Sequence, residues 1–101
     1  MSKWADYAIT AVSYDNDHDH IQQLEVREDL GSSLGSPTIE SRQRVVNSIK
    51  RGNTYVTATE DENDKWQKGD DVSIIRVNGV DYLRTDGNSR ASDNLGELPE
   101  F

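Results

Sequence analysis

The dipeptide Asn78-Gly79 constrains the fold more than any other feature of this chain. It separates two runs rich in apolar residues, 72–77 and 80–83. Such a pair is typical of a two-residue type I′ hairpin turn, because both central residues need positive φ. The turn also fixes the register of the two strands. The predicted pairs are Val77–Val80, Ile75–Tyr82 and Ser73–Arg84 on one face, and Arg76–Asp81 and Ile74–Leu83 on the other. Since both faces carry apolar residues, a single helix can cover only one of them.

Three further strands are predicted from residue type and alternation. Residues 6–14 are rich in aromatic and β-branched types, and residues 21–28 alternate apolar with polar side chains. We expect the second of these strands to lie at a sheet edge. Residues 29–38, with two glycines and a proline, predict a loop. Residues 54–59 predict another strand, and the charged segment 60–70 predicts a polar connection.

A helix is predicted at about residues 38–51. Its apolar positions recur at helical spacing, and they are Ile39, Val45, Val46 and Ile49. Gly52 follows, where a left-handed residue ends a helix. Three starting points remain open: Ser36 as N-cap with Pro37 in the first turn, or Thr38 or Ser41 as the cap of a shorter helix.

These elements predict a single α+β domain over residues 1–101 in the order β-β-α-β-β-β. One helix packs on a mixed or antiparallel sheet, and residues 86–101 form an extended C-terminal tail. The alternative is a small, partly open β-barrel with one helix. We expect Leu95, Leu98 and Phe101 to dock on the second face of the hairpin. The other interpretation is a displayed tail whose terminal Phe101 is captured by a partner.

The charge balance excludes whole classes of partner. Nineteen acidic and eleven basic residues give a net charge of −8, which opposes binding to nucleic acid or to anionic membranes. We find neither a signal peptide nor an apolar run near the ~20 residues of a membrane span, and we expect a cytoplasmic monomer. The absence of cysteine excludes disulfides, thiolate zinc sites and thiol nucleophiles.

The densest run of metal-ligand types is residues 15–20. Its candidate ligands are Asp15, Asp17, His18 and His20. A calcium loop needs Gly at its sixth position and Glu at its twelfth, where this chain has His20 and Val26. We therefore interpret the run as a solvated turn and expect no metal and no cofactor.

Nothing in the sequence predicts catalysis. The stretch Gly31-Ser-Ser-Leu-Gly35 lacks the Lys and the preceding buried strand of a phosphate loop, and both histidines lie in the one acidic turn. Three residues are candidates for partner binding instead. Trp66 lies in a charged segment and is predicted to be an exposed anchor, whereas Trp4 is expected in the core. Arg44 and Arg51, seven residues apart, share a helix face that suits an acidic partner or a phosphate group.

Two segments near the C-terminus carry a family resemblance. They are Tyr82-Leu83-Arg84-Thr85-Asp86 and Asp93-Asn94-Leu95-Gly96-Glu97-Leu98-Pro99. In these segments the chain resembles a family of short bacterial proteins grouped as a domain of unknown function. The resemblance implies no substrate, cofactor or catalytic residue. The leading hypothesis is a non-enzymatic module of a bacterial cell that binds a protein partner. The alternatives are an acidic inhibitor that mimics nucleic acid, and a small metal-binding protein or hydrolase.

Overall fold

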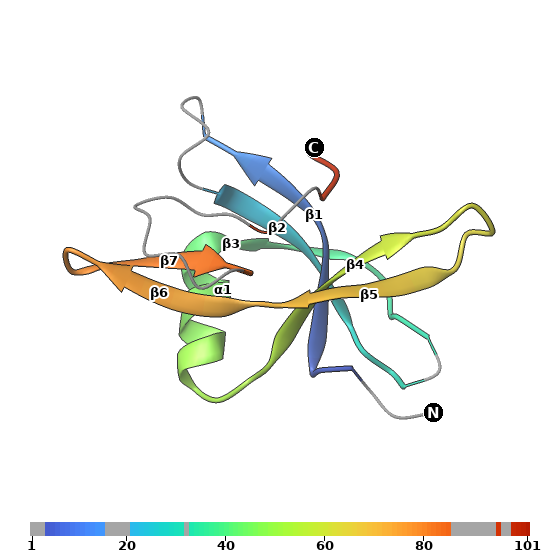
Figure 1. Cartoon of the computed structure of the whole chain (residues 1–101), viewed down its shortest axis with the longest axis horizontal. Coiled ribbons are helices and arrows are strands. Elements are labelled where there is room, and N and C mark those ends of the chain that lie inside the picture. The colour runs from blue at the N-terminus through green and yellow to red at the C-terminus, as the bar shows by residue number, and fades with distance from the viewer. Residues whose placement is uncertain (1–3, 16–20, 32, 86–94, 96–97) are drawn as a thin grey trace.

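The computed structural model describes residues 4–15, 21–31, 33–85, 95 and 98–101. Within these residues it contains one helix and seven strands (Figure 1). Their order is β1 (Tyr7–Tyr14), β2 (Ile21–Glu28), β3 (Thr38–Ser41), α1 (Arg42–Lys50), β4 (Tyr55–Glu60), β5 (Trp66–Asp71), β6 (Ser73–Val77) and β7 (Val80–Arg84). The predicted α+β class is confirmed, with two strands more than expected.

The main sheet has five strands in the order β3-β2-β1-β4-β5. Strands β1 and β4 pair in parallel, and the other neighbours pair antiparallel. Parallel neighbours need a crossover connection, and here the chain crosses through β2, β3 and α1. Strands β6 and β7 form a separate two-stranded sheet. Within the described part of the chain, the strands do not close into a barrel.

The hairpin prediction is confirmed in every pair. All five residue pairs between β6 and β7 have the predicted register. Asn78 and Gly79 have φ of 52° and 82°, as a type I′ turn requires. The register of this hairpin was therefore predictable from the turn residues and their neighbours.

The helix is shorter than predicted, because its expected first turn is a strand. Residues Thr38–Ser41 form β3 and pair with β2, which makes β2 an interior strand and the edge prediction wrong. Ile39 is 54% exposed, so its helical spacing did not reflect burial. Ser41 caps α1, and its hydroxyl accepts a hydrogen bond from the Arg44 N–H at 3.2 Å. Gly52 has φ of 100° and follows the helix as predicted.

The segment 60–70 is more than a polar connection. Its second half begins β5, an edge strand that pairs antiparallel with β4. The Asp61 carboxylate accepts hydrogen bonds from the Asn63 and Lys65 N–H groups, and Asp64 has φ of 60°. These contacts reverse the chain. Every β5 residue after Trp66 is exposed, which suits an edge strand.

The two faces of the main sheet bury different amounts of apolar surface. One face packs against α1 in the main core, which includes Ile9, Val12, Leu24, Val45, Val46, Tyr55, Leu83, Leu95 and Leu98. The opposite face has a smaller cluster of Ala8, Val56 and Ala58, with the partly buried Trp4, Ala5, Leu34 and Trp66 packed on it. A nine-residue α1 is far shorter than a membrane span, and the described residues contain no helix able to cross a bilayer.

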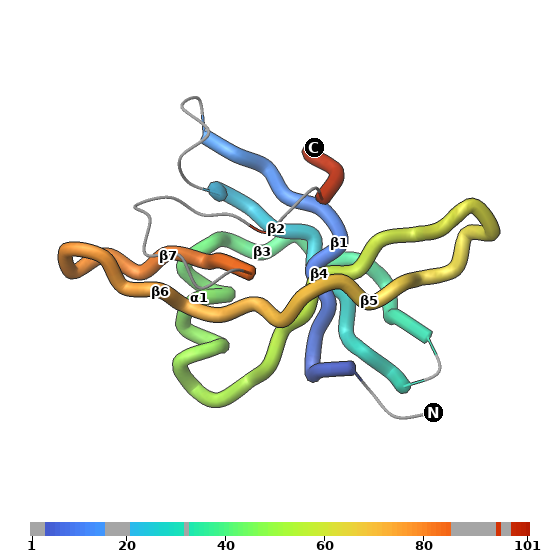
Figure 2. Tube along the Cα trace, viewed as in Figure 1, coloured from blue at the N-terminus to red at the C-terminus, as the bar shows by residue number. Residues whose placement is uncertain are grey.

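The C-terminal segment lies beside β1 (Figure 2). The Val12 N–H donates to the Pro99 carbonyl at 2.9 Å, and the Phe101 N–H donates to the Val12 carbonyl at 3.0 Å. Leu95 and Leu98 are buried in the main core. Phe101, which we expected to dock with them, is 52% exposed. Residues 86–94 and 96–97 of the expected tail lie outside the described residues.

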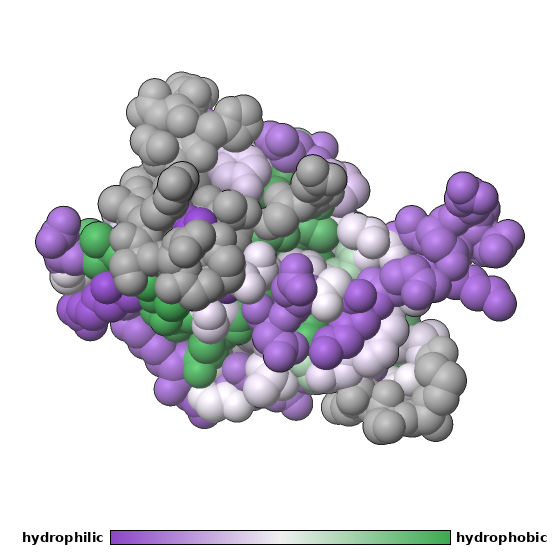
Figure 3. All heavy atoms as spheres, in the orientation of Figure 1, coloured by the Kyte–Doolittle hydropathy of each residue, from purple (hydrophilic) through white to green (hydrophobic). Residues whose placement is uncertain are grey.

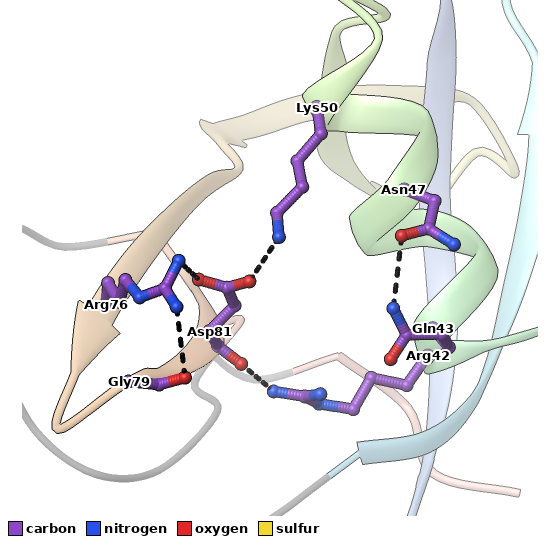
Figure 4. Close-up of polar contacts among 7 residues, drawn as sticks. All are labelled: Arg42, Gln43, Asn47, Lys50, Arg76, Gly79 and Asp81. Carbon is purple, nitrogen blue, oxygen red and sulfur yellow. Dashed lines mark hydrogen bonds and ion pairs between the residues drawn. The ribbon is translucent and has the colours of Figure 1, made fainter.

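Asp81 joins the β6–β7 hairpin to α1 (Figure 4). Its carboxylate lies 2.5 Å from the Lys50 Nζ and 3.9 Å from an Arg76 nitrogen, and its carbonyl accepts a hydrogen bond from Arg42. The Arg42 guanidinium also lies 5.8 Å from the centre of the Tyr82 ring. The hydrogen bond with Lys50 lowers the pKa of Asp81 below its ordinary value, and the nearby positive charges act in the same direction.

Candidate functional site

Two pockets contain the residues that the sequence proposed for binding. The first, which we call the tryptophan pocket, has a volume of about 460 Å³ and lies on the sheet face opposite α1. It is lined by Trp4, Asp29, Gly31, Ser33, Leu34, Asp64, Lys65 and Trp66. The predicted binding residue Trp66 thus shares a pocket with Trp4, which we expected in the core.

Buried Asp29 positions the N-terminal side of the tryptophan pocket. One carboxylate oxygen accepts hydrogen bonds from the Trp4 and Ala5 N–H groups at 2.8 and 3.3 Å. The other accepts from the Gly31 N–H at 2.9 Å. Asp29 is 3% exposed and follows β2 directly. This carboxylate therefore ties the segment before β1 to the loop after β2, and Trp4 is fixed on the sheet.

Trp66 differs from its prediction in both setting and exposure. It begins strand β5 and is half-buried, whereas we expected an exposed side chain on a connection. It packs on the small cluster of Ala8, Val56 and Ala58. The Arg27 guanidinium lies 5.0 Å from the ring centroid and donates to the Gly35 carbonyl at 3.1 Å. Trp66 is therefore held in place on one side while it lines the pocket.

The second pocket, which we call the helix–sheet pocket, lies between α1 and the main-core face of the sheet. Its volume is about 420 Å³. Its lining residues are Tyr7, Val26, Glu28, Gly35, Ser36, Thr38, Glu40, Arg44, Ser48, Arg51, Asn53 and Tyr55. The predicted pair Arg44 and Arg51 therefore does share one site.

Three lining residues form a row across three adjacent strands. Tyr7 of β1 pairs with Glu28 of β2 on one side and with Tyr55 of β4 on the other. Directly paired residues point to the same face of a sheet. The two tyrosine rings stack with their centroids 5.1 Å apart. Because strands are spaced by about 4.8 Å, Glu28 and Tyr55 lie about 10 Å apart along this row. No pattern in the sequence had singled out Tyr7, Glu28 or Tyr55 as a binding residue.

The charges of the helix–sheet pocket are only partly paired. The Arg44 Nε lies 3.7 Å from a Glu40 carboxylate oxygen, and the Arg44 side chain is 73% exposed. Glu28 and Arg51 have no side-chain ion pair within the part of the chain that the structure describes. Burial raises the pKa of Tyr55 above its ordinary value, although its hydrogen bond with Ser48 and the charge of Arg51 act in the opposite direction.

Three of the four candidate metal ligands lie outside the described residues. Asp17, His18 and His20 lie outside the described residues, and Asp15 follows β1. Among residues 4–15, 21–31, 33–85, 95 and 98–101, no three His, Cys, Asp or Glu side chains are grouped as metal ligands.

Comparison with known proteins identifies the family of this chain. No curated protein and no solved structure matches the chain. One family model, described as a protein of unknown function (DUF3892), matches residues 8–99. This range includes both segments that carry the resemblance noted from the sequence, and the expected kinship with a domain of unknown function is confirmed. The chain belongs to the DUF3892 family of proteins of unknown function.

Proposed function

We propose that this chain is a non-enzymatic binding module of the bacterial cytoplasm. Its tryptophan pocket takes an arginine or lysine side chain from a basic segment of a protein partner. The observation that carries the proposal is that two indole rings, Trp4 and Trp66, and two carboxylates, Asp29 and Asp64, line one pocket.

This combination suits a long cationic side chain. A cation over an indole face gains about 0.5–1 kcal/mol when exposed and about 2 kcal/mol when desolvated. The methylene stem of Arg or Lys packs on apolar surface, which Leu34 and the indoles provide here. Arg27 already places a guanidinium 5.0 Å from the Trp66 ring centroid, so this ring accepts such a group within the chain itself.

The net charge favours a basic partner. A charge of −8 attracts cationic segments and speeds their association at low salt. Within the pocket, Asp29 is engaged by backbone N–H groups, whereas exposed Asp64 presents its charge at the turn. Lys65 lines the same pocket with the opposite charge. Replacing Asp64 or Lys65 should therefore change affinity in opposite directions.

Nucleic-acid mimicry receives less support. Mimicry requires a continuous negative face. Figure 3 shows a strongly hydrophilic surface over the β4–β5 hairpin, but Lys65 and Lys68 interrupt its acidic residues. The basic-peptide proposal requires only a local negative charge beside the indoles.

The test is titration with peptides whose ends are capped by acetyl and amide groups. The probes are Gly-Arg-Gly and Gly-Lys-Gly, with Gly-Leu-Gly as the neutral control. The chain has two tryptophans, so both indole N–H resonances can be followed by NMR. We expect saturable shifts of both resonances with the Arg and Lys peptides, and a weaker response to the Leu peptide.

Three charge variants make the test specific. Asp64→Asn should weaken Arg-peptide binding about fivefold, the equivalent of about 1 kcal/mol for one nearby charge. Lys65→Gln should tighten binding. Glu62→Gln, in the same turn but outside the pocket, should leave it unchanged. Equal binding of the Leu peptide, no saturable shift, or an unaltered affinity in Asp64→Asn would each overturn the proposal.

A further inference from the structure

Strand β5 has a free outer edge beside the tryptophan pocket. It is the last strand in the order β3-β2-β1-β4-β5, so β4 pairs with one side of it (Figure 1). No strand in the described part of the chain pairs with its other side. Trp66 is the first residue of β5 and also lines the pocket. The free edge and the proposed cation site therefore share one residue.

The hydrogen bonds of the β4–β5 hairpin indicate which backbone groups of β5 face β4. Next to the turn, the Asp61 N–H donates to the Lys65 carbonyl at 2.8 Å. Hydrogen-bonded and non-hydrogen-bonded pairs alternate along an antiparallel ladder. The next bonded pair after Asp61–Lys65 is therefore Thr59–Gln67, two residues further along both strands. The Gln67 N–H and carbonyl thus point toward β4.

The residues on either side of Gln67 have the opposite orientation. Trp66 and Lys68 occupy the non-bonded positions of the ladder, so their N–H and carbonyl groups point away from β4. Unpaired backbone groups along a strand edge are a template for a further strand. These two residues therefore offer two donors and two acceptors, in strand geometry, next to the pocket.

The charge of the hairpin determines which strand can be added. Residues 60–71 contain six acidic residues and two lysines, a net charge of −4. One of these lysines, Lys68, already lies 3.7 Å from an Asp71 carboxylate oxygen. Like charges on neighbouring strands repel, so a second copy of this hairpin is a poor occupant of the edge. A basic segment has the complementary charge.

We infer that the basic segment of the partner binds in extended form, as an added strand on the outer edge of β5. This inference rests on the proposed function and adds the conformation and register of the ligand. The basic residue pairs with Trp66, because directly opposed residues point to the same face of a sheet. Trp66 packs on the face opposite α1, where the pocket lies. The Arg or Lys side chain therefore leaves the added strand on the pocket side.

Backbone methylation of a peptide tests the added strand. The probe is the capped peptide acetyl-Thr-Val-Arg-Val-Thr-amide. When its Arg pairs with Trp66, the Arg N–H donates to the Trp66 carbonyl, whereas the N–H of the following Val points to solvent. N-methylation of the Arg nitrogen should weaken binding about fivefold or more, the equivalent of one lost hydrogen bond. N-methylation of that Val nitrogen should change affinity less than about twofold.

Amide hydrogen exchange, measured by NMR on the full chain, locates the peptide. At saturating peptide, exchange of the Trp66 and Lys68 amides should slow at least about fivefold, because each gains a hydrogen bond or is covered. The Gln67 amide is the internal control. It is bonded to β4 in the free chain as well, so its exchange should change less.

Position 68 offers a matched pair of variants. Lys68→Pro removes an N–H that points away from β4, and proline is tolerated at such edge positions. Lys68→Gln removes the same charge but keeps the N–H. We expect Lys68→Pro to bind the Arg pentapeptide about fivefold more weakly than Lys68→Gln does. Equal melting temperatures show that both variants are folded, and the methylated peptides test the parent chain independently.

The outcomes distinguish this inference from the proposed function. No saturable binding of the Arg pentapeptide, equal affinity of the two methylated peptides, or unchanged exchange at Trp66 and Lys68 would overturn the added strand. The cation site would still be judged by the Arg, Lys and Leu tripeptides. Equal binding of acetyl-Thr-Val-Leu-Val-Thr-amide, with the same amides protected, would overturn the cation site alone. Protection that rises with protein concentration in the absence of peptide would identify a second copy as the occupant and overturn the basic segment.

Discussion

Gly69→Ala should destabilise the protein, although alanine is the better residue for a strand by about 0.5–1 kcal/mol. Gly69 lies where β5 bulges: Val56 of β4 pairs with Asp71 and Ala58 pairs with Lys68, so two β5 residues oppose Thr57. A Cβ at Gly69 would lie 2.2 Å from the Thr57 Oγ1 and 3.2 Å from the Thr57 carbonyl oxygen. The distance to the Oγ1 is far below van der Waals contact, and the distance to the carbonyl oxygen is tighter than most Cβ contacts.

Thr57 has little freedom to move away from a Cβ at position 69. Thr57 is 5% exposed, and its Oγ1 accepts a hydrogen bond from the Asp70 N–H at 3.0 Å. Overpacking of this kind costs about 1–3 kcal/mol. At the middle of both ranges, subtracting a conformational gain of about 0.75 kcal/mol from a cost of about 2 kcal/mol leaves a net loss of about 1 kcal/mol. For a domain of this size, each 1 kcal/mol corresponds to about 4–8 °C in Tm.

A double-mutant cycle measured by urea unfolding tests the cause. Thr57→Ala removes the clashing oxygen, so Gly69→Ala should cost at least about 1 kcal/mol less in that background. Gly35→Ala is the matched control. Its Cβ would meet Glu28 atoms only at 3.6 Å or more, and the change should be neutral or slightly stabilising. Equal stability of Gly69→Ala and the parent, or additive effects in the cycle, would refute the reasoning.

Two further expectations concern the Asp81 contacts between the β6–β7 hairpin and α1, and the C-terminal segment. Because the pKa of Asp81 is lowered in the folded protein, its contribution is present above the ordinary carboxyl value of about 4 and is lost as the pH falls through the lowered value. Asp81→Asn should therefore lower the free energy of unfolding at neutral pH and make it fall less as the pH is lowered. Urea unfolding between pH 2 and 7 measures this. Parallel pH profiles of the variant and the parent would contradict the expectation. Leu98→Ala should cost about 2–5 kcal/mol because the side chain is buried, whereas Phe101→Ala should stay within about 0.5 kcal/mol. Equal effects of the two changes on the denaturant midpoint would show that burial does not govern this segment.

The predictable part of the fold is the part determined by short-range geometry. Asn78-Gly79 specifies a turn type, and the turn type specifies the strand register, so the hairpin follows from two residues and their neighbours. Strand β5 has no such signal. Its residues are exposed apart from Trp66, so they show no alternation, and its turn is closed by hydrogen bonds to the Asp61 side chain. The motif Asp61-Glu-Asn-Asp64 between two strand-forming segments could have indicated it.

Short β3 was missed for a different reason. Ile39 falls at helical spacing from the buried valines of α1, so the pattern extended the helix backwards. In the structure the four residues pair with β2, and the helix starts after Ser41. A helical spacing of apolar residues predicts that each of them is buried, but the spacing itself does not show burial. Here the side chain that completed the pattern is exposed at the sheet edge.

The same distinction between short-range and long-range geometry separates the two candidate sites. Arg44 and Arg51 are two helical turns apart, so one helix suffices to place them on the same side, and the sequence anticipated their shared surface. Trp4 and Trp66 come together only because β4 lies between β1 and β5 while Asp29 ties down the segment before β1.

The row from Glu28 through Tyr7 to Tyr55 depends on the parallel pairing of β1 with β4. Strand order and register across a crossover are long-range properties, which neither alternation nor turn chemistry encodes. The crossover through β2, β3 and α1, which local sequence patterns do not encode, is therefore also what brings Glu28, Tyr7 and Tyr55 into one row.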